Sequence, residues 1–99
     1  TLTLTLTLTL TPPLTLTLKL ASSLNQLGQA QLALWEYARA ADTYRKAAAL
    51  WVPSSHQSVG LATALTGRGH AKLGTGDLAG ACSDLKSAVD LFEQAIDEG

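Results

Sequence analysis

Residues that could carry out catalysis or hold a metal are few and widely spaced in this 99-residue sequence. His56 and His70 lie fourteen positions apart, and Cys82 is the one cysteine. Zinc sites use closely spaced pairs such as C-x2-C or H-x3-H, and neither spacing is present. A Cys–His nucleophile needs a third residue to orient the histidine, and none is evident near Cys82. We therefore expect no catalytic residue, no metal and no cofactor, and we interpret Cys82 as a buried structural thiol.

The glycines and aspartates in the second half of the chain are a further place to look for chemistry. The stretches 67–69 and 74–77 are rich in glycine, but a phosphate-binding loop needs G-x4-G-K-[ST] after a strand. We interpret them as helix-packing and turn glycines. Asp77, Asp84 and Asp90 recur along one expected helix, so we predict solvated or capping residues rather than a pair of catalytic carboxylates. The sequence thus predicts a protein that is not an enzyme.

Composition excludes several classes of partner. The chain is 46% hydrophobic and 15% charged, with seven basic and eight acidic residues. No basic cluster could neutralise a run of phosphates, so we expect no nucleic-acid partner. No apolar run approaches the roughly 18 residues that span a bilayer, so we expect no membrane partner. One cysteine and no signal peptide favour a reducing, cytoplasmic location, and the lack of methionine is expected of a fragment or a processed chain.

The first nineteen residues differ from the rest. Thr and Leu alternate over residues 1–10 and again over 14–18, on either side of Pro12 and Pro13. Alternation is a strand pattern, but no later segment could pair with it, so we predict that 1–19 is an extended or disordered low-complexity arm. Thr11 as a cap with Pro12 following would instead start a helix near Pro13. Ser23 and Gln26 form a capping box that suggests a later start.

From Leu20 onward the apolar residues recur at helical spacing. We predict helices over about 20–34, 36–50, 57–73 and 78–96. The second ends before Pro53, the third before the glycines at 74 and 76, and Asp77 is placed to cap the fourth. The expected fold class is all-α, with two antiparallel helix pairs at 20–55 and 56–99.

The two predicted pairs also resemble each other. A shift of 41 residues places Gly28 on Gly69, and most other matches are apolar residues. The repeat-signature positions of the two copies are, in order, Leu24, Gly28, Tyr37, Ala40, Tyr44 and Ala47, then Leu65, Gly69, Leu78, Ala81, Leu85 and Ala88. Their spacing resembles the tetratricopeptide repeat, whose pattern is W-x2-L-G-x2-Y followed by A-x3-F, A and P. The chain departs from the family in its period, 41 instead of 34, and in Arg68, which stands where leucine is usual.

The resemblance implies a short α-solenoid that binds proteins or peptides in a concave groove lined by the first helix of each pair. Carried onto this sequence, the groove residues are Asn25, Gln26, Gln29, Thr63, Thr66 and His70. Asn and Gln can donate to and accept from a peptide backbone. The basic residues that some family members use to hold acidic peptide tails are absent, since Thr66 and Gly67 occupy their places.

Two other functions remain open from sequence. Two repeats are fewer than the three that usually give independent stability, so the chain could be a structural module that self-associates. It could also be a non-catalytic regulatory segment of a larger signalling protein.

Overall fold

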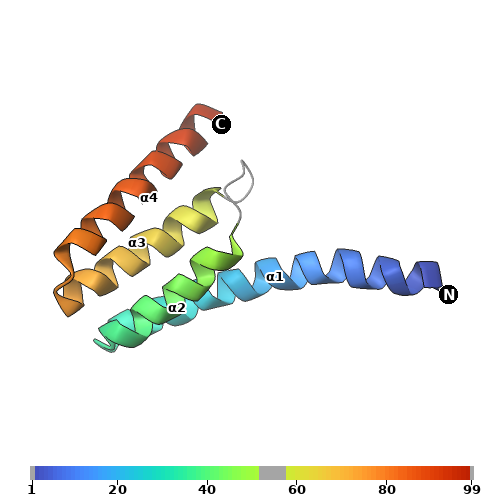
Figure 1. Cartoon of the computed structure of the whole chain (residues 1–99), viewed down its shortest axis with the longest axis horizontal. Helices are drawn as coiled ribbons and strands as arrows, with labels where there is room; N and C mark the ends of the chain where they lie inside the picture. The colour runs from blue at the N-terminus through green and yellow to red at the C-terminus, as the bar shows by residue number, and fades with distance from the viewer. Residues whose placement is uncertain (1, 52–57, 99) are drawn as a thin grey trace.

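The computed structural model describes the backbone of residues 2–51 and 58–98 and the side chains of 16–51 and 58–97, and every regular element there is a helix (Figure 1). The helices are α1 (Leu2–Ala33), α2 (Tyr37–Leu50), α3 (Ser58–Thr75) and α4 (Leu78–Glu98). The all-α fold class is therefore confirmed. The ends of α2, α3 and α4 agree with the predicted ranges to within two residues.

The prediction of an extended or disordered arm at 1–19 differs from the structure. Helix α1 begins at Leu2, passes through Pro12 and Pro13, and continues without a break at Ser23. A strand would need a partner to satisfy its backbone, and the described residues offer none, whereas a helix forms these bonds within itself. Leucine also favours helix formation. The first part of α1 extends well beyond the other three helices (Figure 1).

The two short turns of the chain have the same construction. In the first, Trp35 has a φ of 65° and the Glu36 N–H donates to the Gln31 carbonyl at 2.9 Å. In the second, Gly76 has a φ of 91° and the Asp77 N–H donates to the Lys72 carbonyl at 2.9 Å. A residue with positive φ just after a helix is a common helix ending. The turns are 41 positions apart, which agrees with the period found in the sequence.

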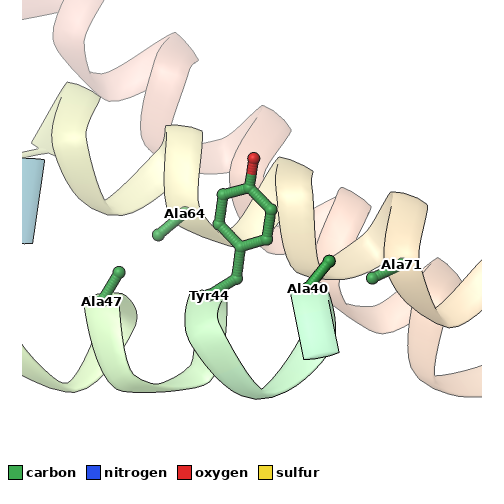
Figure 2. Close-up of a cluster of buried hydrophobic side chains, with 5 residues drawn as sticks. All are labelled: Ala40, Tyr44, Ala47, Ala64 and Ala71. Atoms are coloured by element: carbon green, nitrogen blue, oxygen red, sulfur yellow. The ribbon is translucent and has the colours of Figure 1, made fainter. Parts of the chain in front are cut away.

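Each helix packs on the next one along the chain, and α1 also contacts α3. Most of the core residues are alanines, which let the helices approach closely. The main cluster surrounds Tyr44 with four fully buried alanines, Ala40, Ala47, Ala64 and Ala71 (Figure 2). A smaller cluster of Ala62, Leu65 and Ala88 joins α3 to α4. Tyr44 is therefore the one large buried side chain of the main cluster.

The contact between α2 and α3 follows a seven-residue register. Three rings of α2 and three glycines of α3 face each other in opposite order: Tyr37 with Gly74, Tyr44 with Gly67, and Trp51 with Gly60. A Cβ added to Gly60 would lie 2.7 Å from the Trp51 ring, closer than real Cβ contacts allow. Tyr44 is also held from the other side, since a Cβ at Gly28 would lie 2.7 Å from its ring. Each ring thus occupies the space that a missing side chain leaves.

An ion cluster links α3 to α4 and corrects one prediction. Asp84 is only 5% exposed, so it is not the solvated residue expected from the sequence. Arg68 donates two hydrogen bonds of 2.7 Å to its carboxylate, and Lys72 lies 3.0 Å from the same group. Arg68, which departs from the tetratricopeptide pattern, is therefore the partner of a buried carboxylate.

The ion cluster should make stability depend on pH in the acid range. Burial raises the pKa of Asp84, but the hydrogen bonds from Arg68 and Lys72 outweigh burial and hold this pKa below its ordinary value. A carboxyl whose folded pKa is lowered stabilises the fold above its unfolded pKa, about 3.9. That contribution is lost as the pH falls through the folded pKa. The stability advantage of the natural chain over Asp84→Asn, measured by urea unfolding, should shrink from pH 7 towards pH 3. An advantage that does not change with pH would contradict this.

Candidate functional site

All six residues predicted to line a groove lie around one groove between α1 and α3. It has a volume of about 510 Å³. α1 contributes Asn25, Gln26 and Gln29, and α3 contributes Thr63, Thr66 and His70. The side chains come from opposite walls because the groove lies over the space where α1 and α3 meet. The structure therefore brings the six predicted residues together.

Asn25 links the two walls at one end of the groove. Its Nδ2 donates to the backbone carbonyl of Gly60 on α3, at 3.3 Å. Its Oδ1 is buried and accepts no hydrogen bond from the described residues. A buried acceptor without a partner costs about 1–3 kcal/mol, so this oxygen gains if a donor enters the groove.

Trp51 places an unused donor at the same end. Its ring lies against Gly60, the residue whose carbonyl holds Asn25, and it lines the same groove. The indole Nε1–H is buried and finds no acceptor among the described residues. Asn25 and Trp51 thus hold one buried acceptor and one buried donor beside the groove, near Gly60, without partners among the described residues. These are the two groups that complement the N–H and C=O of a peptide backbone.

The other polar residues differ in what they can offer. The Thr63 hydroxyl donates to the Val59 carbonyl, and the Thr66 hydroxyl donates to the Ala62 carbonyl, both at 2.8 Å. Because their protons are used within α3, both threonines can only accept. Gln29 and His70 are exposed. The α3 wall is therefore mainly a source of acceptors, and the α1 wall supplies both donors and acceptors.

The floor of the groove is aromatic and uncharged. Tyr44 forms part of it while being almost wholly buried, and this burial raises the pKa of its phenol. Phe92 reaches the groove from α4. None of the described residues that line it is Asp, Glu, Lys or Arg. A ligand with a strong charge would find no counter-charge there.

Sequence reasoning missed several lining residues, namely Ser22, Leu32, Tyr44, Trp51, Gly60, Gly67 and Phe92. Tyr44 was assigned to the core only. Trp51 lies seven residues after Tyr44, and this spacing could have shown that Trp51 lines the groove as well. The prediction of a buried Cys82 is wrong, because its side chain is exposed on α4. The described part of α4 has apolar residues on two faces, one buried and one exposed. The alanines near Cys82 in the sequence therefore did not show whether its side chain is buried.

Metal and membrane binding can be examined only where the chain is described. Within residues 2–51 and 58–98, no three His, Cys, Asp or Glu side chains are close enough to hold a metal ion. His56 lies outside the described residues. None of the four described helices combines the length and the apolar character needed to cross a bilayer.

Comparison with models of protein families, with curated protein sequences and with solved structures finds no match to this chain. The tetratricopeptide resemblance consequently depends on its own residues and spacing.

Proposed function

We propose that the chain is a protein-interaction scaffold that binds an extended peptide in the groove between α1 and α3. In this proposal the helices form two antiparallel pairs, 20–55 and 56–99, of a short tetratricopeptide-like α-solenoid. The observation that carries the proposal is the meeting of six polar side chains, with an unused buried acceptor and donor, in one uncharged groove.

The chemistry of the groove favours recognition of the peptide backbone. An uncharged wall of Asn, Gln and Thr forms hydrogen bonds without a preference for charged side chains. The Asn25 Oδ1 would accept an N–H from the peptide, and the Trp51 Nε1–H would donate to a carbonyl of the peptide. Both protein atoms are already buried, so pairing them removes a penalty that the free protein bears. The floor around Tyr44 and Phe92 would receive apolar side chains of the peptide.

Changing the exposed groove residues should weaken peptide binding. Peptides selected from a random library against the whole chain would be measured by fluorescence anisotropy. The double variant Gln29→Glu, His70→Glu should bind at least about tenfold more weakly, since it places two charges in an uncharged groove and a loss of about 1.4 kcal/mol is tenfold. Both side chains are exposed, so helicity should remain unchanged.

The matched control is Ser83→Glu, Ser87→Glu, which adds the same two charges on the exposed surface of α4, away from the groove. This control should bind as the natural chain does. A second test replaces the backbone N–H groups of the peptide by N-methyl, one position at a time. Methylation should abolish binding at one position of the peptide. Equal binding by the groove variant and the control would contradict the proposal.

A further inference from the structure

Helix α4 packs only on α3 among the described helices, and it carries a row of apolar side chains most of which are exposed. Its members are separated alternately by four and three residues, the 3.5-residue period of helices that pair along their length. Leu78 is 66% exposed, Val89 53% and Ile96 76%, which is unusual for large apolar residues in one row. The complete row, here named the α4 stripe, consists of Leu78, Cys82, Leu85, Val89, Phe92 and Ile96.

The α4 stripe corresponds to a surface that is covered on α2. The 41-residue shift relates Tyr37 to Leu78, Tyr44 to Leu85, and Trp51 to Phe92. On α2 these residues pack on α3, which presents a glycine to each of them. On α4, Leu85 lies against Gly69 of α3, as Tyr44 lies against Gly28 of α1, but no further described helix packs on α4 as α3 packs on α2. The α4 stripe is therefore a helix-packing surface.

A second copy cannot cover this stripe in the way that α3 covers α2. The α1 positions equivalent to the glycines at 60, 67 and 74 are Lys19, Gln26 and Ala33. Side chains at these positions fill the space that the glycines leave open on α3. Stacking of copies by α1 on α4 would therefore lack the glycine spaces of the α2–α3 contact and would not repeat that contact.

Charge points to α4 of a second copy instead. Lys86 is the only base on α4, and Glu93 lies seven residues later along the same flank of the stripe; both are exposed. If two α4 helices run in opposite directions with Val89 opposite Phe92 of the second copy, each Lys86 faces a Glu93. Opposite charges beside the seam of paired helices select partner and orientation.

The other arrangements lack this pairing. Shifting the two opposed helices by one heptad brings Leu85 opposite Val89, and then the two Lys86 side chains face each other. Parallel helices place Lys86 and Glu93 beside the buried alanines on the far flank, such as Ala81 and Ala88, which offer no charge. One antiparallel register therefore pairs Leu85, Val89, Phe92 and Ile96 with apolar residues of the second copy and also matches the charges.

We propose that a second copy of this chain covers the part of the α4 stripe from Leu85 to Ile96, in a two-fold dimer with antiparallel α4 helices in this register. The central layers pair Val89 with Phe92, and the outer layers pair Leu85 with Ile96. The same surface serves both copies, as a two-fold interface requires. Phe92 belongs to both the groove and the stripe, so the two proposals are tested at other residues, Gln29 and His70 for the groove and Val89 for the stripe.

The test measures the mass of the whole chain in solution by sedimentation equilibrium. The natural chain should have twice its mass of 10.3 kDa. Lys86→Glu and Glu93→Lys should each weaken dimerisation at least tenfold, because each opposes like charges. The double variant should restore it. Val89→Asp should give a monomer with unchanged helicity. Phe92 is left unaltered because it also lines the groove.

Several outcomes would overturn the proposal. If the natural chain is monomeric, a second copy does not cover the α4 stripe, and a helix of another protein is the expected partner. Association that survives Val89→Asp places the contact elsewhere, for example on the segment 1–19. Single charge variants that dimerise like the natural chain refute the register.

The register also puts the two Cys82 residues about 25 Å apart along the helices. A disulfide needs Cα atoms within about 7 Å, so rapid Cys82 cross-linking by oxidant would indicate a parallel dimer.

Discussion

Replacing Gly67 by alanine should destabilise the fold by about 1–3 kcal/mol, the usual cost of overpacking a core. In an ordinary helix the same change stabilises by up to about 1 kcal/mol, so the expected sign is reversed. The reason is the ring of Tyr44, which lies directly against Gly67 and is held from behind by Gly28. The ring cannot move away from a new methyl group without disturbing the buried alanines around it.

The coupling between Gly67 and Tyr44 can be measured by urea unfolding of a double-mutant cycle. Tyr44→Leu removes the ring and will itself destabilise the chain. In that background Gly67→Ala should be neutral or stabilising, so the two changes should be non-additive by at least about 1 kcal/mol. Ser87→Ala, at an exposed helix position, is the control and should change little. Additive effects at positions 67 and 44 would show that the ring does not occupy the space above Gly67.

Arg68→Met should lower the free energy of unfolding by about 2–3 kcal/mol. Asp84 is buried, and removing one partner leaves its carboxylate with Lys72 alone. Breaking a fully buried ion pair costs about 3–5 kcal/mol, and the expected loss is smaller because Lys72 remains and the Arg68 side chain is 25% exposed. Methionine keeps much of the length of the arginine stem, so the lost energy reports mainly on the charge.

The matched control for Arg68→Met is Arg45→Met on α2. Arg45 pairs with Asp42 at 2.8 Å, a distance similar to that in the buried cluster, but both side chains are more than half exposed. A surface ion pair of this kind contributes about 0–1 kcal/mol. Chemical unfolding at pH 7 should therefore separate the two variants clearly. If both lose the same small amount, Asp84 is not an important link between α3 and α4.

The helices were predictable because their signals are local. Leu and Ala at helical spacing, Pro53 after the second helix and the glycines at 74 and 76 set the ranges of α2 to α4 closely. Asp77 was expected as a cap, and its Oδ1 accepts the Gly80 N–H at 3.0 Å. The six residues predicted to line a groove lie around one groove.

The features that sequence reasoning missed depend on tertiary contacts. Asp84 is solvated or buried according to whether α3 presents a base, and Arg68 was noted only as a departure from a pattern. Cys82 sits on a face of α4 that is apolar yet exposed, so composition around it was misleading. Residues 1–19 were predicted to be an extended or disordered arm because no other strand could pair with them, and the helical alternative was placed only from Pro13, whereas α1 begins at Leu2.

The register between the rings of α2 and the glycines of α3 lay in the sequence without being recognised. Residues 37, 44 and 51 are seven apart, as are 60, 67 and 74. Each series alone looks like ordinary helical spacing. Only their pairing across two helices shows that one compensates for the other.

The claim that the groove binds a peptide backbone is tested most directly by the indole N–H signals of the two tryptophans. In a titration of the ¹⁵N-labelled chain with a selected peptide, followed by NMR, the Trp51 Nε1–H signal should move downfield as it gains an acceptor. Trp35 is 77% exposed and lies outside the groove, so its signal should stay in place. A Trp51 signal that is unchanged at saturating peptide would contradict the account.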